Sequence, residues 1–379
     1  MKITQIELVT YSRGIIVHAG AVDWLWVRIH TDEGVTGLGE TYPCAGAESA
    51  VIARSLAGML LGRNPLQIDR LWADMFLAVS YHGWAGAEIR AISAIDLALW
   101  DLAGKVAGQP LYQLLGGASR DEIAIYNTCY DHIDFHNDPV LLARELMASG
   151  IRAMKIWPFD PIAKRNGGQT ISPAEIREGM EPLRLIRQEF GDSMQVAMEF
   201  HGYWNLPCAV KIARAIEHLE PMWLEEMLPQ DNLGAYRELA DRVATPLTLS
   251  ERLMTRYGFR ELLENRAASV IMPDICWCGG ISEAKKIASM AETYYLPVAP
   301  HNCGGPVLHF ASAHLAANLT NLFILETVRR HYLDEYEGLL TAELRPVNGK
   351  LPLPPGPGLG CDLDPAIFSR PNVRVERLG

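Results

Sequence analysis

Ionisable residues recur at nearly even intervals through the second half of the chain, and each closes a short apolar run. The separations are 26, 26, 23, 27 and 25 residues between Glu199, Glu225, Glu251, Asp274, His301 and Glu326. A period of about 25 residues accommodates one strand, one helix and two loops. This period predicts that the same end of every strand comes to one place, where the ionisable groups form an active site.

Eight candidate strands can be placed along the repeat. They lie at 123–127, 152–157, 196–200, 222–226, 246–251, 269–274, 296–301 and 322–326. Amphipathic segments lie between them, which is typical of β-α units, and eight such units predict an α/β fold with a TIM (β/α)₈ barrel over 123–340. The connection at 157–170 is longer than usual and is expected to shape the pocket.

Residues 1–122 follow a different pattern. The segment 24–39 alternates apolar and polar residues around Asp32-Glu33-Gly34, which is typical of a hairpin. Residues 87–108 carry apolar side chains at helical spacing, and Gly108 and Pro110 end the run. We therefore predict a separate α+β unit over 1–122. The segment 341–379, rich in Pro and Gly, is expected to return across that unit.

The composition points to small-molecule chemistry. The net charge of −11 is spread along the chain without a basic run, so the sequence does not favour nucleic acid as a partner. No apolar stretch approaches the ~18 residues that a membrane span needs, and the alternating residues 1–10 are expected to form a strand, since no apolar signal-peptide core follows them. Seven cysteines without a CxxC pair are expected to be reduced thiols. We expect a cytoplasmic protein.

Three carboxylates close consecutive candidate strands: Glu199, Glu225 and Glu251. Three neighbouring anions would repel each other, so a hard divalent cation is their natural partner. We predict Mg²⁺ at these residues, with Mn²⁺ as the other candidate. Taken singly, each glutamate could equally be solvated or paired with a barrel lysine or arginine. Glu226 should point to the opposite face, where a structural ion pair is expected.

Asp274 and His301 close the next two candidate strands. A carboxylate that binds one imidazole nitrogen orients the ring and raises its basicity, so this pair is predicted to be a general base. A satisfied buried histidine or a further metal ligand is the alternative. Strand alternation places His201 on the same face as Glu199, as a general acid, a metal ligand or a supporting donor. Lys155 could be an acid or base, a contact for a substrate carboxylate, or a counter-charge to the glutamates.

These residues and the motifs around them resemble the enolase superfamily, specifically its mandelate racemase branch, over nearly the whole chain. The similarity rests on TDEGVTGLGE, AISAIDLALWDLAGKVAGQPLYQLLGG, WLEE, SER, and the pairing of PD at 273–274 with APH at 299–301. The resemblance implies a capping domain made by the N-terminal segment and the C-terminal tail over a modified barrel. It also implies one Mg²⁺ on three carboxylates and removal of the proton α to a substrate carboxylate. Glu326 would then bind the substrate carboxylate or the enolate, and a homo-oligomer, octamer or dimer, is expected.

Departures from the branch pattern narrow the reaction. The strand-2 pair reads Lys155-Ile156-Trp157, so the second lysine of many members is absent, which weakens two-base racemisation. Glu199 stands where aspartate is commoner, and Met227 where a proline is usual. The motifs EFHG and APHNCGGP resemble acid sugar dehydratases of the D-galactonate dehydratase type, which pair a histidine base with a histidine acid.

We therefore expect a Mg²⁺-dependent lyase that dehydrates an aldonate-like sugar acid. His301, oriented by Asp274, would remove the C2 proton, and His201 would protonate the leaving 3-hydroxyl, giving a 2-keto-3-deoxy acid. A racemase, epimerase or lactone cycloisomerase using the same enolate is the alternative. A non-catalytic protein that binds a metal or a sugar acid is a second alternative.

Substrate contacts are expected from two segments of the capping domain, 11–22 and 81–85. The side chains there or nearby that could bind hydroxyl groups are Arg13, His18, Tyr42, His82 and Trp84. Trp157, at the position of the missing lysine, is expected to narrow the pocket or to stack on a sugar face.

Overall fold

The computed structural model describes residues 1–17, 20–81 and 83–379. A curled sheet of parallel strands lies at its centre, in the order β10-β4-β5-β6-β7-β8-β9. Its strands are β4 (Glu122–Thr128), β5 (Ala153–Ile156), β6 (Gln195–Glu199), β7 (Leu224–Glu225), β8 (Leu247–Leu249), β9 (Val270–Ile271) and β10 (Leu325–Thr327). The short strand β11 (Lys350–Pro352) pairs with β4 from outside, antiparallel.

The sequence predicted eight barrel strands, and the segment at 296–301 is not a regular strand. It joins its neighbours through isolated bridges, from Val298 to Ile271 on one side and to Leu322 on the other. The backbone N–H of Ala299 also donates to the carbonyl of Ile271 at 2.9 Å. These bonds connect β9 to the chain that leads into β10, so the ring is completed with fewer ladder bonds than a full strand would make. The predicted α/β barrel is confirmed.

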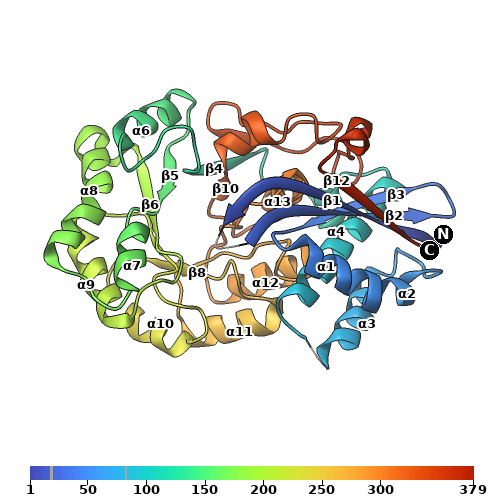
Figure 1. The fold of residues 1–379 in the computed structure, drawn as a ribbon, viewed down its shortest axis with the longest axis horizontal. Helices are drawn as coiled ribbons and strands as arrows, with labels where there is room; N and C mark the ends of the chain where they lie inside the picture. The colour runs from blue at the N-terminus through green and yellow to red at the C-terminus, as the bar shows by residue number, and fades with distance from the viewer. Residues whose placement is uncertain (18–19, 82) are drawn as a thin grey trace.

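Helices surround the outside of the ring (Figure 1). They are α6 (Pro139–Ala148), α7 (Asp160–Asn166), α8 (Pro173–Phe190), α9 (Leu206–Ile216), α10 (Leu233–Ala240), α11 (Thr255–Asn265), α12 (Gly280–Thr293) and α13 (Pro306–Asn318). Short 3₁₀ turns occur at Gly191–Ser193, Glu217–Leu219 and Pro365–Ser369, and short π turns at Ile52–Leu56 and His331–Glu335. Among the described residues, no helix has the length and apolar character needed to cross a membrane.

The connection at 157–170, expected to be a loop, contains a helix. Asp160-Pro161 opens α7, and Pro is well suited to the first turn of a helix because its missing N–H would have no helical partner there. The helix ends at Asn166, followed by Gly167 in the left-handed conformation with φ 61°. This helix brings its first residue, Asp160, to the barrel mouth.

A second unit, which we call the cap, packs against one side of the barrel (Figure 1). Its antiparallel sheet has the order β12-β1-β2-β3, with helices beside it. The cap elements are β1 (Ile3–Val17), β2 (Gly20–Thr31), β3 (Thr36–Thr41), β12 (Val373–Leu378), α1 (Ala45–Val51), α2 (Ala57–Leu60), α3 (Ile68–Ser80), α4 (Ala87–Ala107) and α5 (Leu111–Leu114). The predicted hairpin is confirmed, with its turn between β2 and β3 and Gly34 at φ 77°.

The predicted helix at 87–108 is α4, and it lies directly against β3. Gly37 and Gly39 of β3 allow this close approach, because a Cβ at either position would collide with the carbonyl oxygen of Ala98 or Ala94. The helix ends at Gly108, which has φ 64°. Sheet and helix together bury one continuous apolar layer of the cap.

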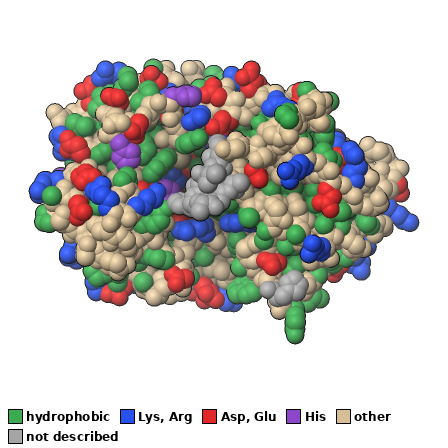
Figure 2. Space-filling view, viewed as in Figure 1, with side chains coloured by type: hydrophobic (Ala, Val, Ile, Leu, Met, Phe, Trp, Pro, Cys, Tyr) green, Lys and Arg blue, Asp and Glu red, His purple; other side chains and the backbone are tan. Residues whose placement is uncertain are grey.

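The C-terminal tail returns across the cap. The backbone N–H of Leu359 donates to Asp101 of α4 at 2.8 Å, and His314 of α13 donates through Nε2 to the carbonyl of Leu359 at 3.1 Å. The tail then ends in β12, which pairs with β1 in the register Ile6 to Leu378. Figure 2 shows acidic and basic side chains intermingled over one face of the molecule.

Candidate active site

The structure brings the three predicted metal ligands together at the carboxyl ends of neighbouring strands. Glu199 and Glu225 are the last residues of β6 and β7 and lie opposite each other in the ladder. Glu251 follows β8 by two residues. Each offers a carboxylate oxygen, and these oxygens lie within 4.8 Å of one another. Glu199 and Glu225 are buried, whereas Glu251 is partly exposed at the cavity.

The chain turns sharply after each of these strands. His201 has φ 49°, Glu226 has φ 45° and Ser250 has φ 111°, all in a region that side chains other than glycine rarely occupy. The strand alternation from which we placed His201 is therefore wrong, because β6 has already ended. Strained backbone of this kind persists where surrounding contacts hold it, often at functional sites.

The predicted outward ion pair of Glu226 is confirmed, although its backbone is no longer extended. Its carboxylate pairs with Arg252 and is almost fully buried. Burial and the nearby charge of Glu251 raise the pKa of Glu226 to about 8, despite the attraction of Arg252. This glutamate is not among the three that converge on the candidate metal centre.

Lys155 lies among the buried carboxylates at the end of β5. Its Nζ is 2.5 Å from Glu225, 2.9 Å from Glu326 and 3.4 Å from Glu199. Burial opposes the lysine charge, but the carboxylates outweigh it and hold the pKa of Lys155 well above its usual range. Of the roles open to this residue, the contacts support a counter-charge.

The carboxylates outnumber the cations that face them, which fits a divalent ion. Burial and the charge of Glu199 raise the pKa of Glu225 well above its usual range, although Lys155 is in contact. Burial also opposes ionisation of Glu199, but His201 and Lys155 outweigh it and lower the pKa of Glu199. Three converging carboxylate oxygens form a donor set that hard divalent cations prefer.

Asp274 and His301 form the predicted dyad. The two residues face each other through an isolated bridge, and Oδ2 of Asp274 lies 2.7 Å from Nδ1 of His301. The other ring nitrogen, Nε2, is 3.3 Å from Glu251 and 3.8 Å from Glu326. Burial disfavours the charged ring, but these two carboxylates outweigh burial and raise the pKa of His301 well above its usual range.

Tyr42 has a different position from the one we expected. It was one of the side chains that could bind substrate hydroxyl groups, but its ring is buried and its hydroxyl donates to Oδ2 of Asp274 at 2.6 Å. The cap therefore braces the dyad through the carboxylate of Asp274. The backbone N–H of Cys276 donates to the other oxygen, Oδ1, at 2.7 Å, which completes the bonding of Asp274.

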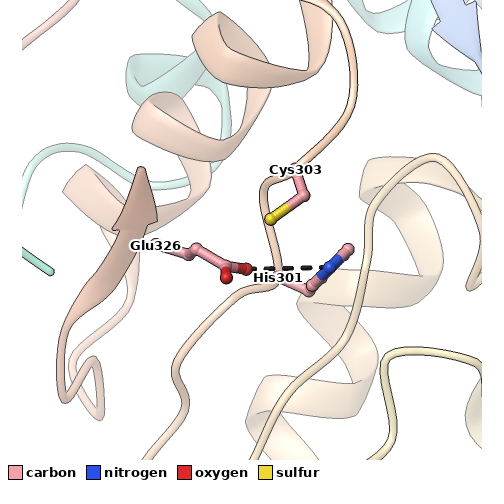
Figure 3. A group of neighbouring side chains, drawn as sticks. All are labelled: His301, Cys303 and Glu326. Atoms are coloured by element: carbon pink, nitrogen blue, oxygen red, sulfur yellow. Dashed lines mark ion pairs between the residues drawn. The ribbon is translucent and has the colours of Figure 1, made fainter. Parts of the chain in front are cut away.

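Glu326 lies on β10, next to His301 and Cys303 (Figure 3). It accepts a hydrogen bond from Thr128 and another from the backbone N–H of Asn302 at 2.8 Å. Burial opposes its ionisation, but Lys155 and His301 outweigh burial and lower the pKa of Glu326 to about 2. The thiol of Cys303 points toward the space between the two side chains, and burial raises its pKa to about 12.

His201 stands at the side of the same site. Its Nδ1 lies 2.8 Å from Oδ2 of Asp160, and the Trp157 ring meets it edge-on at 5.9 Å between centroids. Burial disfavours the charged ring, but the charge of Glu199 and the bond to Asp160 raise the pKa of His201 to about 9. Asp160 escaped the sequence analysis, because only the Asp-Pro dipeptide within a long connection pointed to it.

A cavity of about 290 Å³ joins these groups. The predicted residues that line it are Arg13, Lys155, Trp157, Glu199, His201, Glu251 and His301. Val22, at the end of the expected segment 11–22, lines it too, as do five residues that the sequence did not indicate: Thr128, Tyr130, Cys303, Val328 and His331. Trp84, another side chain that could bind hydroxyl groups, is 57% exposed and does not line this cavity. His18 and His82 lie outside the described residues.

The chain belongs to the enolase superfamily, in the mandelate racemase and muconate lactonizing enzyme group. Residues 140–367 match the family described as enolase C-terminal domain-like. Residues 15–116 match the N-terminal domain of the mandelate racemase / muconate lactonizing enzyme family. The predicted membership is therefore confirmed, and with it the prediction that the chain is an enzyme.

Relatives with similar sequences or structures span nearly the whole chain. A D-xylonate dehydratase of Haloferax volcanii is 34% identical, covering 91% of this chain and 84% of the relative. A D-galactonate dehydratase of Xanthomonas euvesicatoria pv. vesicatoria is 32% identical, covering 98% and 94%. The crystal structure of a mandelate racemase subgroup enolase from Agrobacterium tumefaciens is 43% identical, with a TM-score of 0.91, covering 100% and 99%.

Proposed function

We propose that the protein dehydrates a monocarboxylate sugar acid, removing the C2 proton and the 3-hydroxyl to give a 2-keto-3-deoxy acid. One observation carries the proposal: two histidines, each bonded through Nδ1 to an aspartate, line one cavity with two of the three clustered glutamates. Such a pair can divide base and acid work between two residues. The names of the relatives above, dehydratases of D-xylonate and D-galactonate, support the same reaction class.

Glu199, Glu225 and Glu251 would hold the metal ion, and Mg²⁺ is the ion we propose, with Mn²⁺ as a substitute. When bound, the ion would supply positive charge that favours the enediolate, which carries one more negative charge than the substrate carboxylate. It would also offset part of the negative charge that now surrounds His301, because Glu251 contributes to both groups. A neutral His301 is the form that can accept a proton.

His301 would take the C2 proton through Nε2, since Asp274 already occupies Nδ1. The electron pair left on carbon becomes part of an enediolate. His201 would then donate a proton to the 3-hydroxyl oxygen, the C3–O bond would break, and water would leave as the enediolate electrons form the C2=C3 bond. The resulting enol ketonises to the 2-keto acid. One water is lost for each turnover.

Lys155 would not exchange protons with the substrate in this scheme. Three carboxylates already surround its ammonium group, which keeps the lysine charged. Its role is to balance the buried negative charge beside the metal ligands. Glu326 would stabilise the enediolate side, where it is fixed by Thr128 and by the backbone N–H of Asn302.

The test uses a library of sugar acids with Mg²⁺ in D₂O. Semicarbazide detects a 2-keto product, and proton NMR detects loss of the C2 proton from unreacted acid. The wild type should give keto product with at least one acid, and His301→Asn should lose both signals, whereas His218→Asn, at an exposed histidine, should keep them. Exchange at C2 without keto product would assign the site to a racemase or epimerase instead. If a folded, metal-loaded protein gave neither keto product nor exchange at C2, the proposal would be overturned.

A further inference from the structure

The carboxylate of Asp160 is placed for a single task. It belongs to the first turn of α7, yet it does not cap that helix, whose N-cap makes no side-chain hydrogen bond. Its side chain is buried, with Oδ2 at 2.8 Å from Nδ1 of His201. Oδ1 is buried as well and has no hydrogen-bond partner among the described residues. Burying a carboxylate costs free energy unless the group is well hydrogen-bonded. The bond to His201 therefore indicates a role for this carboxylate at the ring.

The His201 ring is fixed on several sides. Its backbone N–H donates to Oε1 of Glu199 at 2.7 Å, and its φ of 49° sets the direction in which the side chain leaves the backbone. The rings of Trp157 and Tyr203 lie 5.9 and 6.1 Å from it. Because Nδ1 is bonded to Asp160, Nε2 is the ring nitrogen that remains available to a ligand in the cavity that His201 lines.

The base dyad uses the same nitrogen and the same kind of partner. There, however, Asp274 is also bonded to Tyr42 and to the backbone N–H of Cys276, so its position does not depend on the ring. For Asp160, by contrast, Oδ1 has no hydrogen-bond partner in the described part of the chain. The contact between Oδ2 of Asp160 and Nδ1 of His201 is therefore the polar contact that orients this carboxylate and engages one nitrogen of the ring.

We propose that Asp160 is a positioning residue that holds His201 in the orientation needed to protonate the departing 3-hydroxyl. The inference rests on the proposed dehydratase reaction and adds a division of labour to it. Asp274 serves removal of the C2 proton, and Asp160 serves loss of the hydroxyl. The two halves of the reaction should then be separable by mutation.

The decisive variant is Asp160→Asn, with Asp274→Asn as its matched counterpart in the other dyad. Dehydration by Asp160→Asn should fall by about 10²-fold in kcat, with KM within about threefold of the wild type. Exchange of the C2 proton in D₂O should continue, so the ratio of exchange to keto product should rise. Asp274→Asn should lower exchange and dehydration together. Asp160→Glu should restore part of the dehydration, because it keeps a carboxylate for Nδ1.

A double-mutant cycle tests whether Asp160 acts through His201. In a His201→Asn background, Asp160→Asn should cause no further loss of dehydration, because residues that act as one unit are not additive. Additive losses, or an equal fall of exchange and dehydration in Asp160→Asn, would assign Asp160 a merely structural role and overturn the inference. A wild type without any keto product would instead defeat the proposed function, so the two failures are distinguishable. Mg²⁺ titration by calorimetry confirms that the metal site of each variant is intact.

Discussion

Buried carboxylates occur in two regions of this molecule, and the two regions treat them differently. Where the cap meets the barrel, the buried carboxylate of Glu40 is bonded by the protein itself. Glu40 accepts from the indole of Trp26 at 2.8 Å and from the backbone N–H groups of Gly305, Val307 and Leu308, at the start of α13. Both oxygens of Glu40 therefore have donors, and this acid ties the cap to the barrel.

At the barrel mouth the acids face one another instead. Glu199, Glu225 and Glu326 share the ammonium group of Lys155. One cation is insufficient for this many charges, and burial without compensation is unfavourable. We infer two different roles from this difference. A buried carboxylate that accepts several hydrogen bonds from the protein stabilises the fold. A cluster of carboxylates with too few cations is suited to binding a metal ion.

The largest effect should come from a glutamate of the proposed metal site. Glu225→Gln should weaken Mg²⁺ binding on the order of 10³-fold, about 4 kcal/mol, and abolish turnover, because it removes one ligand charge from the cluster. Calorimetric titration with Mg²⁺ measures the affinity. Glu226→Gln is the matched control, since this neighbouring glutamate pairs with Arg252 and lies outside the cluster. Equal loss in both variants would contradict the ligand assignment.

Lys155→Met should destabilise the metal-free protein by about 3–5 kcal/mol, because the carboxylates lose their shared cation. Added Mg²⁺ should then stabilise the variant more than it stabilises the wild type. Urea unfolding with a chelator and with Mg²⁺ measures both quantities, and Lys211→Met, at an exposed lysine of α9, is the control. If Mg²⁺ stabilised variant and wild type equally, the counter-charge role would be wrong.

Where the C-terminal tail crosses the cap, Asp101→Asn should lower the free energy of unfolding by about 2–3 kcal/mol while kcat stays unchanged. Asp101 accepts the backbone N–H groups of Leu38 and Leu359, each at 2.8 Å, and an amide would turn a donor toward one of them. Urea unfolding beside steady-state kinetics checks this. Asp69→Asn, at an exposed ion pair with Lys286, should change little. A large loss of kcat in Asp101→Asn would contradict the prediction that this carboxylate stabilises the fold without affecting catalysis.

The smallest effect concerns pH. Burial lowers the pKa of His314 to about 4, although its bond to Leu359 opposes the shift. The unfolded chain therefore binds a proton between pH 6.5 and 4 that the folded chain does not. Stability from this group is complete above pH 6.5 and falls with acidification, by about 2 kcal/mol at pH 5.

His314→Gln keeps a donor for the carbonyl of Leu359 and removes the titration, so its stability should decline less between pH 7 and pH 5. Urea unfolding at the two pH values measures the difference. His218→Gln, at an exposed histidine, should decline as the wild type does. A decline in His314→Gln equal to that of the wild type would show that this ring does not contribute to acid sensitivity.

The sequence predicted the parts of the site that the repeat itself positions. Glu199, Glu225, Glu251, Asp274 and His301 could be assigned to one place because each follows an apolar strand, and the strand period fixes where it lies. The α4 helix and the hairpin before it also carried local signals, in apolar spacing and turn residues. Features of this kind depend on neighbours in the chain.

The features that could not be predicted from the sequence depend on contacts between distant residues or on local backbone geometry. Tyr42 meets Asp274 across 232 residues, and no periodic pattern encodes that bond. Asp160 meets His201 across 41 residues through a helix that a long connection concealed. His201 reached the pocket for a reason other than strand alternation, because a left-handed residue after β6 redirects the chain. Such geometry has no signature in residue type alone.

The pairing of β12 with β1 has a consequence for dividing this protein into parts. Asn372 bonds Ser12, 360 residues earlier, so the cap sheet is assembled from both ends of the described chain. A fragment comprising 1–122 would leave β1 with an open edge, which invites pairing with another molecule. Chimeras that exchange caps between relatives should therefore transplant both segments together, since either alone would bring a sheet without its outer strand.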